Sequence, residues 1–303
     1  MLRQPAWRMS VEPVIGDTDA VDASSVVAER IQEFLQRIRT HLTDNNSRVG
    51  SLRIRVHEEV SFHTGLGSGT QLGLALSAAM ELMIHHRLPD DPFQLAQLAA
   101  RAERSAIGTF GFARGGFLVD HGEAQTGELH RRVDRTAFPD DWRFLLVHPV
   151  NSQGLSGEQE RRFFGQRIHM PPSLIDSIGH QVLEEIVPAV RDQQFASFAA
   201  SLEHYGQVVG GFYAAEQGGV FAHPAMTKLA EHLRDRGVSG MTQSSWGPLI
   251  SIPASSQQHA EEIRGLIPES IDDDRLHVSV SEPLNTGAAI RTIVDDAAGR
   301  GLV

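Results

Sequence analysis

The pattern of apolar and polar positions switches repeatedly between the two-residue period of strands and the longer period of helices. Residues 7–14 and 52–60 alternate apolar with polar side chains, as half-buried strands do. Between them, residues 20–42 carry apolar side chains at helical spacing, and the polar stretch 44–50 ends that helix. The pattern therefore predicts a strand, a long helix and a second strand in this order.

Helical spacing returns after the second strand. Residues 72–83 place apolar side chains on one face of a helix, and a further helix is predicted from Asp91-Pro92 to about residue 103. The segment 104–122 is rich in glycine and aromatic residues, which predicts a loop leading into a short strand at 116–120. Residues 142–147 predict a buried strand.

The second half of the chain is first rich in helices and then rich in strands. Helices are predicted at 172–187, 193–213, 224–236 and 257–266, and strands at 238–242, 249–253 and 275–280. Pro171 and Pro172 interrupt the helical pattern, so we place a domain boundary near residues 166–172.

Composition and charge narrow the range of functions. The 303 residues are 41% hydrophobic and 21% charged, which is typical of globular proteins. Because the chain has no cysteine, disulfides, thiolate metal sites and a cysteine nucleophile are excluded. The formal net charge of -11 argues against nonspecific nucleic-acid binding, which requires clustered cations. Lys228 is the only lysine, so a phosphate clamp must use arginines, backbone amides, hydroxyls or a metal ion.

A membrane span is not expected either. The longest apolar stretch, Leu72–Ile84, is broken by Ser77 and Glu81 and is shorter than the roughly 20 residues that a bilayer requires. Residues 1–14 contain no apolar run that could act as a secretory signal. We therefore expect a cytoplasmic protein without a membrane partner.

The strongest local signal is a glycine-rich turn between the second predicted strand and the next helix. Gly65–Gln71 reads Gly-Leu-Gly-Ser-Gly-Thr-Gln. Such a turn points backbone N–H groups at an anion, and the helix dipole adds attraction. Glycine permits positive φ and close approach of the backbone to phosphate. The turn predicts a phosphate site, and a glycine-rich helix start without a ligand is the alternative.

Two well-known phosphate motifs fit this turn poorly. A Walker loop requires a Gly-Lys-Ser/Thr ending, and a dinucleotide fingerprint requires glycine where Thr70 stands. The turn instead resembles the phosphate loop of the GHMP kinase superfamily, whose usual form is Gly-Leu-Gly-Ser-Ser-Ala. Gly69-Thr70-Gln71 departs from that form and is similar to one branch, the β-ribofuranosylaminobenzene 5′-phosphate synthases of methanopterin biosynthesis.

Three further regions resemble the same branch and follow in consistent order along the chain. They are Arg104–Thr109 with Gly115–Asp120, then Gly154–Glu158, and finally Gln243–Pro248.

The resemblance implies an α+β, GHMP-kinase-like two-domain fold. Residues 1–168 would form the N-terminal phosphate-binding domain, which resembles the second domain of ribosomal protein S5, and residues 169–303 would form a ferredoxin-like C-terminal domain. In the family, a strand and a turn with a glycine pair precede the segment that residues 1–14 match. We therefore expect in-frame coding sequence upstream of Met1. A homodimer is a further expectation, because homodimers are common in the superfamily.

The resemblance also implies a decarboxylating phosphoribosyltransferase. Such an enzyme joins phosphoribosyl pyrophosphate to 4-aminobenzoate or 4-hydroxybenzoate and releases CO2 and pyrophosphate. The sugar C1 becomes oxocarbenium-like as pyrophosphate leaves, and the ring carbon para to the amino or hydroxyl group attacks it. The protein must stabilise the departing charge and exclude water.

Residue roles are carried over from the matching motifs. Asp120 and Arg104 are the predicted catalytic residues, and Asp120 with Glu158 are the predicted ligands of Mg2+. The predicted phosphate-binding set is Gly65, Leu66, Gly67, Ser68, Gly69, Thr70 and Gln71. The predicted substrate-binding set is Arg114, Ser244, Ser245 and Gly247, with Trp246 positioned to stack on the aromatic substrate.

Structural roles stay open for several of these residues. Asp120 could be a strand-end acid in a turn, Glu158 a first-turn acid that complements a helix dipole, and Trp246 a core residue. The lone His63 before the turn is not included in the catalytic set. Two other functions stay open as well: an ATP-dependent GHMP-type small-molecule kinase, and a noncatalytic phosphate-binding protein.

Overall fold

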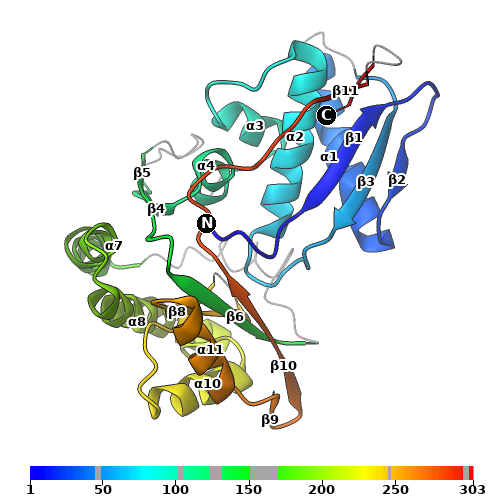
Figure 1. The fold of residues 1–303 in the computed structure, drawn as a ribbon. Helices are drawn as coiled ribbons and strands as arrows, with labels where there is room; N and C mark the ends of the chain where they lie inside the picture. Colours follow the sequence, from blue (N-terminus) through cyan, green and yellow to red (C-terminus); the bar gives the residue numbers. More distant parts are fainter. Residues whose placement is uncertain are drawn as a thin grey trace. The chain divides into compact units, whose positions relative to one another are not determined.

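The computed structural model describes residues 1–44, 49–101, 105–122, 132–150, 170–244, 247–295 and 300–302 (Figure 1). The described chain forms two compact units whose segments interleave along the sequence. Unit 1 contains Met1–Gln4, Ser61–Gly67 and Arg135–Asn285, and unit 2 contains Pro5–Val60, Ser68–Asp134 and Thr286–Val303. The division predicted at residue 168 stays a prediction, because the segment 151–169 lies outside the described residues.

Unit 2 contains a three-stranded sheet with the order β1-β3-β2. Strands β1 (Arg8–Pro13) and β3 (Leu52–Glu58) pair antiparallel, and β2 (Ala20–Asp22) pairs parallel with β3. In β3 the apolar residues Leu52 and Ile54 are buried and Arg53 and Arg55 are exposed, so the predicted alternation is confirmed.

Helix α1 (Ser25–Asp44) begins later than the predicted residue 20, because the chain first forms β2. The start of α1 is held by Ser24, whose backbone N and Oγ both donate to the carboxylate of Glu59 at 2.7 Å. Helix periodicity alone did not reveal this anchor, which joins residues 35 positions apart.

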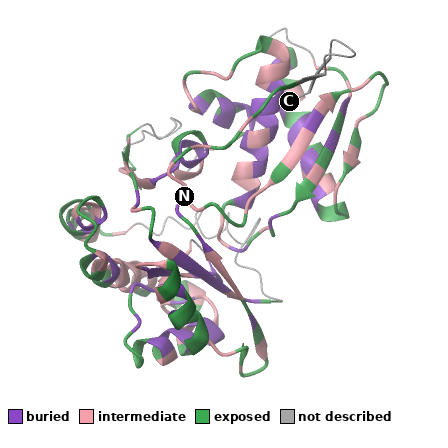
Figure 2. Cartoon of the chain, viewed as in Figure 1, coloured by how far each residue is buried: buried purple, intermediate pink, exposed green. Residues whose placement is uncertain are grey.

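The other helices of unit 2 are α2 (Ser68–His85), α3 (Phe93–Leu98) and α4 (Ile107–Arg114). Half of α2 is buried (Figure 2), and a Cβ on Gly73 would lie 2.7 Å from the ring of Phe34 in α1, so glycine allows the two helices to approach closely. The predicted helix at 91–103 is correct in place but shorter.

The loop predicted at 104–122 was wrong for residues 107–114, which form α4 before strand β4 (Phe117–Asp120). Phe110 and Phe112 of α4 are buried in a cluster with residues of α2 and α3, and the rings of Phe93 and Phe110 meet edge to face at 5.3 Å. This tertiary packing overrides the low helix propensity of the glycines. Strand β4 pairs with β5 (Val133–Thr136).

Unit 1 contains a five-stranded sheet with the order β7-β8-β6-β10-β9. Its pairs are antiparallel, and the strands are β7 (Thr242–Gln243), β8 (Ile250–Ala254), β6 (Arg143–Pro149), β10 (Asp274–Ser281) and β9 (Ser270–Ile271). Helices α10 (Pro224–Arg234) and α11 (Gln257–Leu266) share a hydrophobic core with this sheet. The bounds predicted for α11 are confirmed.

The strand predicted at 238–242 is reduced to β7 for a local reason. The carboxylate of Glu203 accepts hydrogen bonds from Gly240 N at 2.6 Å and Met241 N at 3.2 Å, and Gly240 has φ +89°. Because these two backbone N–H groups donate to the Glu203 side chain, they cannot form hydrogen bonds with a neighbouring strand.

The remaining helices of unit 1 lie between residues 172 and 217. They are α6 (Pro172–Gln181), the π-helical segment η1 (Val182–Ile186), α7 (Val187–Arg191), α8 (Phe195–Phe212) and α9 (Ala214–Gln217). The helix predicted at 172–187 is thus confirmed in place, but it changes hydrogen-bonding pattern within its length. Trp142 and Phe144 pack with Phe138 and Phe198 in an aromatic cluster between the sheet strand β6 and α8.

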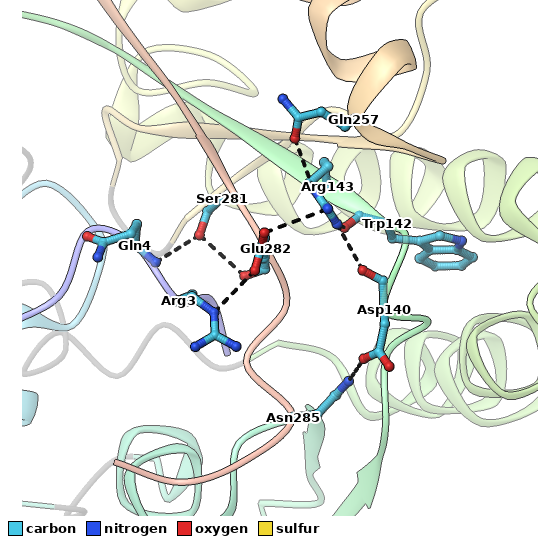
Figure 3. A network of polar contacts seen from close by, with 9 residues as sticks. All are labelled: Arg3, Gln4, Asp140, Trp142, Arg143, Gln257, Ser281, Glu282 and Asn285. Atoms are coloured by element: carbon cyan, nitrogen blue, oxygen red, sulfur yellow. Dashed lines mark hydrogen bonds and ion pairs between the residues drawn. The ribbon is translucent and has the colours of Figure 1, made fainter. Parts of the chain in front are cut away.

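A polar network ties the first residues of the chain to the end of β10 (Figure 3). Arg3 pairs with Glu282 at 3.2 Å, and Gln4 N donates to Ser281 Oγ at 2.9 Å. Arg143 lies 3.7 Å from Glu282 and donates to Gln257 Oε1 at 3.0 Å. These contacts lie within unit 1 and explain how a segment at residues 1–4 joins a sheet formed much later in the sequence.

At the other end of the chain, β11 (Ile293–Asp295) pairs antiparallel with β12 (Arg300–Leu302). In the part of the chain that the structure describes, no helix combines the length and the apolar character needed to cross a bilayer.

Candidate phosphate-binding site

The predicted phosphate turn lies directly between β3 and α2. The chain leaves the sheet at Glu58, turns through Ser61–Gly67 and enters α2 at Ser68. Three residues of the turn have positive φ: His63 at 60°, Gly65 at 92° and Gly67 at 67°. The strand, turn and helix order predicted from the sequence is therefore confirmed, and the two glycines occupy the left-handed region that favours this residue type.

One side of the turn is packed against Ser244, which also belongs to unit 1. Ser244 Oγ donates a hydrogen bond to the carbonyl oxygen of Gly65. A Cβ on Gly65 would collide with the backbone oxygen of Ser244 and lie 3.1 Å from its Cβ. Gly65 is thus required both by its backbone conformation and by this close approach.

Gly67 is in the opposite situation. A Cβ on Gly67 would meet no heavy atom within 4 Å among the described residues. The next residue begins α2, whose first four N–H groups have no intrahelical acceptor, and the helix dipole is positive at this end. The space beside Gly67 therefore adjoins a helix start, which is the kind of place that favours an anion.

The first turn of α2 is held by side-chain contacts within unit 2. Trp7 Nε1 donates to Ser68 O at 2.9 Å, and Gln71 Nε2 donates to Gly108 O at 2.9 Å. A Cβ on Gly108 would lie 2.8 Å from Cγ2 of Thr70. The Gln71 carboxamide and the Thr70 methyl group therefore contact the Gly108 region of α4. The predicted phosphate-binding roles of these two residues stay predictions.

The second predicted anion turn is partly described. Ser244 N donates to Leu249 O at 3.0 Å, and Gly247 N donates to Ser244 O at 2.9 Å. Gly247 has φ +59° and precedes Pro248 in a cis peptide bond. Ser245 and Trp246 lie outside the described residues, so their predicted roles stay predictions.

Asp120 ends β4 and connects it to the start of α4. Its Oδ2 accepts hydrogen bonds from Ala106 N at 2.8 Å and Ser105 Oγ at 3.2 Å, and its Oδ1 accepts from Gly122 N at 3.0 Å. Both carboxylate oxygens thus have protein donors. The local chemistry is that of an anchor for the α4 start, and its predicted catalytic role stays a prediction.

The other predicted charged residues are only partly placed. The Arg114 guanidinium lies over the ring of Phe110 at 5.3 Å, while Arg104 and Glu158 fall outside the described residues. Among the described residues, no group of three or more histidines and carboxylates could hold a metal ion. The predicted Mg2+ site of Asp120 and Glu158 therefore stays a prediction.

Sequence reasoning did not identify two hydrogen-bonded glutamines, Gln217 and Gln243. Gln243 directly precedes Ser244, donates to Gln217 and accepts from Ala222 N. The one available signal was the position of Gln243 directly before Ser244 in the motif Gln243–Pro248. Gln217 carries no sequence signal, because its contact with Gln243 joins residues 26 positions apart.

Comparison with known proteins agrees with the motifs. Residues 27–116 match the GHMP kinases N terminal domain. The β-ribofuranosylphenol 5′-phosphate synthase of Methanothermobacter thermautotrophicus is 24% identical over 263 residues, which cover 82% of this chain and 76% of that protein. The enzyme of the same name from Archaeoglobus fulgidus is 29% identical over 185 residues, covering 53% of this chain and 58% of that protein.

Solved structures share the fold at low sequence identity. Homoserine kinase from Cytophaga hutchinsonii aligns with a TM-score of 0.61 and 13% identity, covering 94% of this chain and 89% of that one. Mevalonate diphosphate decarboxylase from Staphylococcus aureus aligns with a TM-score of 0.59 and 16% identity, covering 93% and 85%. The predicted α+β, GHMP-kinase-like fold is confirmed, and these two structures carry no conclusion about the reaction.

Proposed function

We propose that the chain belongs to the β-ribofuranosylaminobenzene 5′-phosphate synthase branch of the GHMP kinase superfamily and joins phosphoribosyl pyrophosphate to a 4-substituted benzoate. The products of this decarboxylating transfer are CO2, pyrophosphate and a ribofuranosyl benzene 5′-phosphate, in the pathway to methanopterin. The single observation that carries the proposal is the similarity to a β-ribofuranosylphenol 5′-phosphate synthase over 82% of the chain. The open glycine turn is consistent with it.

The proposed reaction balances without an external oxidant or reductant. The bond from the sugar C1 to the pyrophosphate oxygen breaks, and its electron pair leaves with pyrophosphate. The ring carbon that bears the carboxylate, activated by the para amino or hydroxyl group, forms the new bond to C1. The bond to the carboxylate then breaks, CO2 leaves, and its electron pair restores the aromatic ring.

Two requirements of this chemistry concern the protein directly. Negative charge increases on the bridging oxygen as C1–O bond breaking proceeds, so donors placed at pyrophosphate favour the transition state over the bound substrate. We assign this task to the backbone amides of the turn at Gly65–Gly67 and of the α2 start. The oxocarbenium-like sugar must also be kept from water, because attack by water would give ribose phosphate in place of a carbon–carbon bond.

The benzoate side of the site is proposed from the motifs alone. Arg104 and Arg114 are assigned to the sugar phosphate or the benzoate carboxylate, because guanidinium pairs with both in bidentate fashion. Ser245 is assigned with Ser244 and Gly247 to substrate binding. The product name of the relatives contains a phenol, which 4-hydroxybenzoate would yield and 4-aminobenzoate would not.

Mg2+ is proposed as the counterion of pyrophosphate, with Asp120 and Glu158 as protein ligands. A hard cation of this kind binds phosphate oxygens and one or two carboxylates and would neutralise charge on the leaving group. None of the steps above depends on it.

The test is a product assay with carboxyl-labelled 4-hydroxybenzoate and 4-aminobenzoate in separate reactions, each with phosphoribosyl pyrophosphate and Mg2+. We expect release of labelled CO2 and pyrophosphate in equal amounts with at least one benzoate. Pyrophosphate without CO2 would indicate hydrolysis of the sugar donor and contradict the transfer. Formation of ADP from ATP with a small alcohol, and no decarboxylation, would assign the chain to the kinases instead.

A further inference from the structure

We propose that Gln217 and Gln243 form a two-amide relay that positions the phosphate turn, so that Gln243 is a positioning residue for pyrophosphate binding. This inference rests on the proposed function, because it takes the turn at Gly65–Gly67 as the pyrophosphate site. Each contact used for it lies within unit 1.

The relay runs from the loop after α9 to the end of β7. Gln217 Nε2 donates to Gly219 O at 2.9 Å and to Val220 O at 3.0 Å. Gln243 Nε2 donates to Gln217 Oε1 at 3.0 Å, and Gln243 Oε1 accepts from Ala222 N at 2.6 Å. Two neutral side chains thereby connect the loop at 219–222 to the strand that leads into Ser244.

The direction of the relay is determined by its backbone ends. The N–H of Ala222 can only donate, so an oxygen of residue 243 must face it, and the other end of that side chain must donate to residue 217. The carbonyls of Gly219 and Val220 can only accept, so residue 217 must present an N–H to them. A primary amide has one acceptor and one donor end and so satisfies the contacts at residue 217 and at residue 243. A carboxylate at 217 or at 243 would place an oxygen opposite another oxygen, with no proton between them.

The relay reaches the phosphate turn through Gly247 and Ser244. A Cβ on Gly247 would lie 2.8 Å from Gln243 Oε1 and 2.9 Å from its Cδ, so the carboxamide packs directly against this glycine. Gly247 N donates to Ser244 O at 2.9 Å, and Ser244 Oγ donates to Gly65 O. The position of Gln243 therefore determines where the Ser244 hydroxyl stands.

The consequence for an anion follows from peptide geometry. In a trans peptide the C=O and the following N–H point in opposite directions. Because Ser244 Oγ donates to the carbonyl oxygen of Gly65, the N–H of Leu66 is directed away from Ser244. Release of Ser244 would let this peptide rotate, and the Leu66 donor would no longer be preorganised for phosphate.

The experiment compares variants of the full chain by calorimetric titration with inorganic pyrophosphate and by steady-state kinetics. Gln243→Met keeps the length and removes the polar ends, Gln243→Glu keeps one acceptor, and Gln217→Met breaks the relay one step further from the turn. The matched control is Gln181→Met. Gln181 is also in unit 1 and buried, and its Nε2 donates to Ser201 O at 2.9 Å, but it joins α6 to α8 and does not contact the turn.

We expect Gln243→Met and Gln243→Glu to weaken pyrophosphate binding by about 10-fold, and Gln217→Met by about 3- to 5-fold. The KM for phosphoribosyl pyrophosphate should rise in proportion, while the KM for the benzoate stays unchanged. The double variant Gln217→Met with Gln243→Met should bind no more weakly than Gln243→Met alone, because both changes break one connection. Gln181→Met should lower the melting temperature and leave pyrophosphate binding unchanged.

Wild-type affinity in both Gln243 variants would overturn the relay and leave the proposed function standing. Equal loss of binding in Gln181→Met would also overturn it, since the effect would then be one of general stability. If Gln243→Met does not fold, wild-type affinity in Gln217→Met would overturn the relay in the same way. Absence of pyrophosphate binding in the wild-type chain would instead remove the premise taken from the proposed function.

Discussion

The turn at Ser61–Gly67 and the segment Ser105–Gly122 resemble each other in sequence but differ in what their polar groups contact. Both are glycine-rich and adjoin a strand end. In the turn, Ser244 holds the carbonyl of Gly65 from one side, and Gly67 faces open space. In the second segment, the carboxylate of Asp120 is already bonded to Ser105, Ala106 and Gly122.

Glycine density alone therefore does not identify a ligand site. A turn that is held by a hydrogen bond to one carbonyl, and that has open space beside a neighbouring glycine, is suited to receive an anion. A segment whose acceptor is bonded to its own neighbours instead gains local order.

Gly65→Val should have the largest effect, because it affects both the support and the conformation of the turn. The added side chain would collide with Ser244, and valine is strained at φ +92°. We expect a loss of about 3 kcal/mol or more in the free energy of unfolding. Pyrophosphate affinity should fall by at least about 100-fold. Urea unfolding and calorimetric titration measure the two effects, and a stable variant with normal affinity would refute the supported-turn description.

Gly67→Val should abolish pyrophosphate binding while the fold is largely kept. Its side chain would enter the open space in front of the turn, and the positive φ costs only about 1–2 kcal/mol. Gly237→Val is the matched control: Gly237 has φ +81° and, among the described residues, no heavy atom within 4 Å of an added Cβ. Both variants should lose similar stability, and only Gly67→Val should lose binding in titrations with pyrophosphate. Equal affinities would count against the site.

Asp120→Asn separates anchoring from the predicted catalytic role. Asparagine would place an NH2 group where one carboxylate oxygen now accepts hydrogen bonds, so two donors would face each other. The free energy of unfolding should therefore fall by about 1–3 kcal/mol. Urea unfolding measures this change, and kcat measured well below the unfolding midpoint should fall by more than tenfold, because Asp120 is also a proposed ligand of Mg2+. A loss of stability with kcat reduced less than tenfold would show that the carboxylate serves only as the anchor of the α4 start.

The smallest expected effect is a change in the pH dependence of protein stability under acidic conditions. The hydrogen bonds from Arg39 lower the pKa of the Asp19 carboxyl from its usual 3.8. The unfolded chain therefore binds the proton more tightly, so this pair contributes stability above about pH 4 and loses it as the pH falls further. Asp19→Asn should flatten the fall in stability below pH 4, as measured by thermal unfolding at several pH values. An unchanged slope would show that this pair is not stabilising.

Local periodicity predicted most elements because it depends only on neighbours in the chain. The alternation around Leu52 and Ile54 predicted β3, and helical spacing predicted α11 with its observed bounds. Failures occurred where distant contacts outweigh local preference. Burial of Phe110 and Phe112 stabilises a helix in a glycine-rich segment. The Glu203 carboxylate accepts hydrogen bonds from backbone N–H groups of a segment predicted to be a strand.

The candidate site divides in the same way. The position of the phosphate turn, its glycines and the family they resemble could be predicted from the sequence, because positive φ and close backbone approach restrict residue type locally. The support of Gly65 by Ser244, 179 positions away, and the bonding of Asp120 to the α4 start exist only in the folded chain. A hydrogen bond between residues so far apart leaves no periodic trace in either segment, since its geometry exists only after the intervening chain has folded.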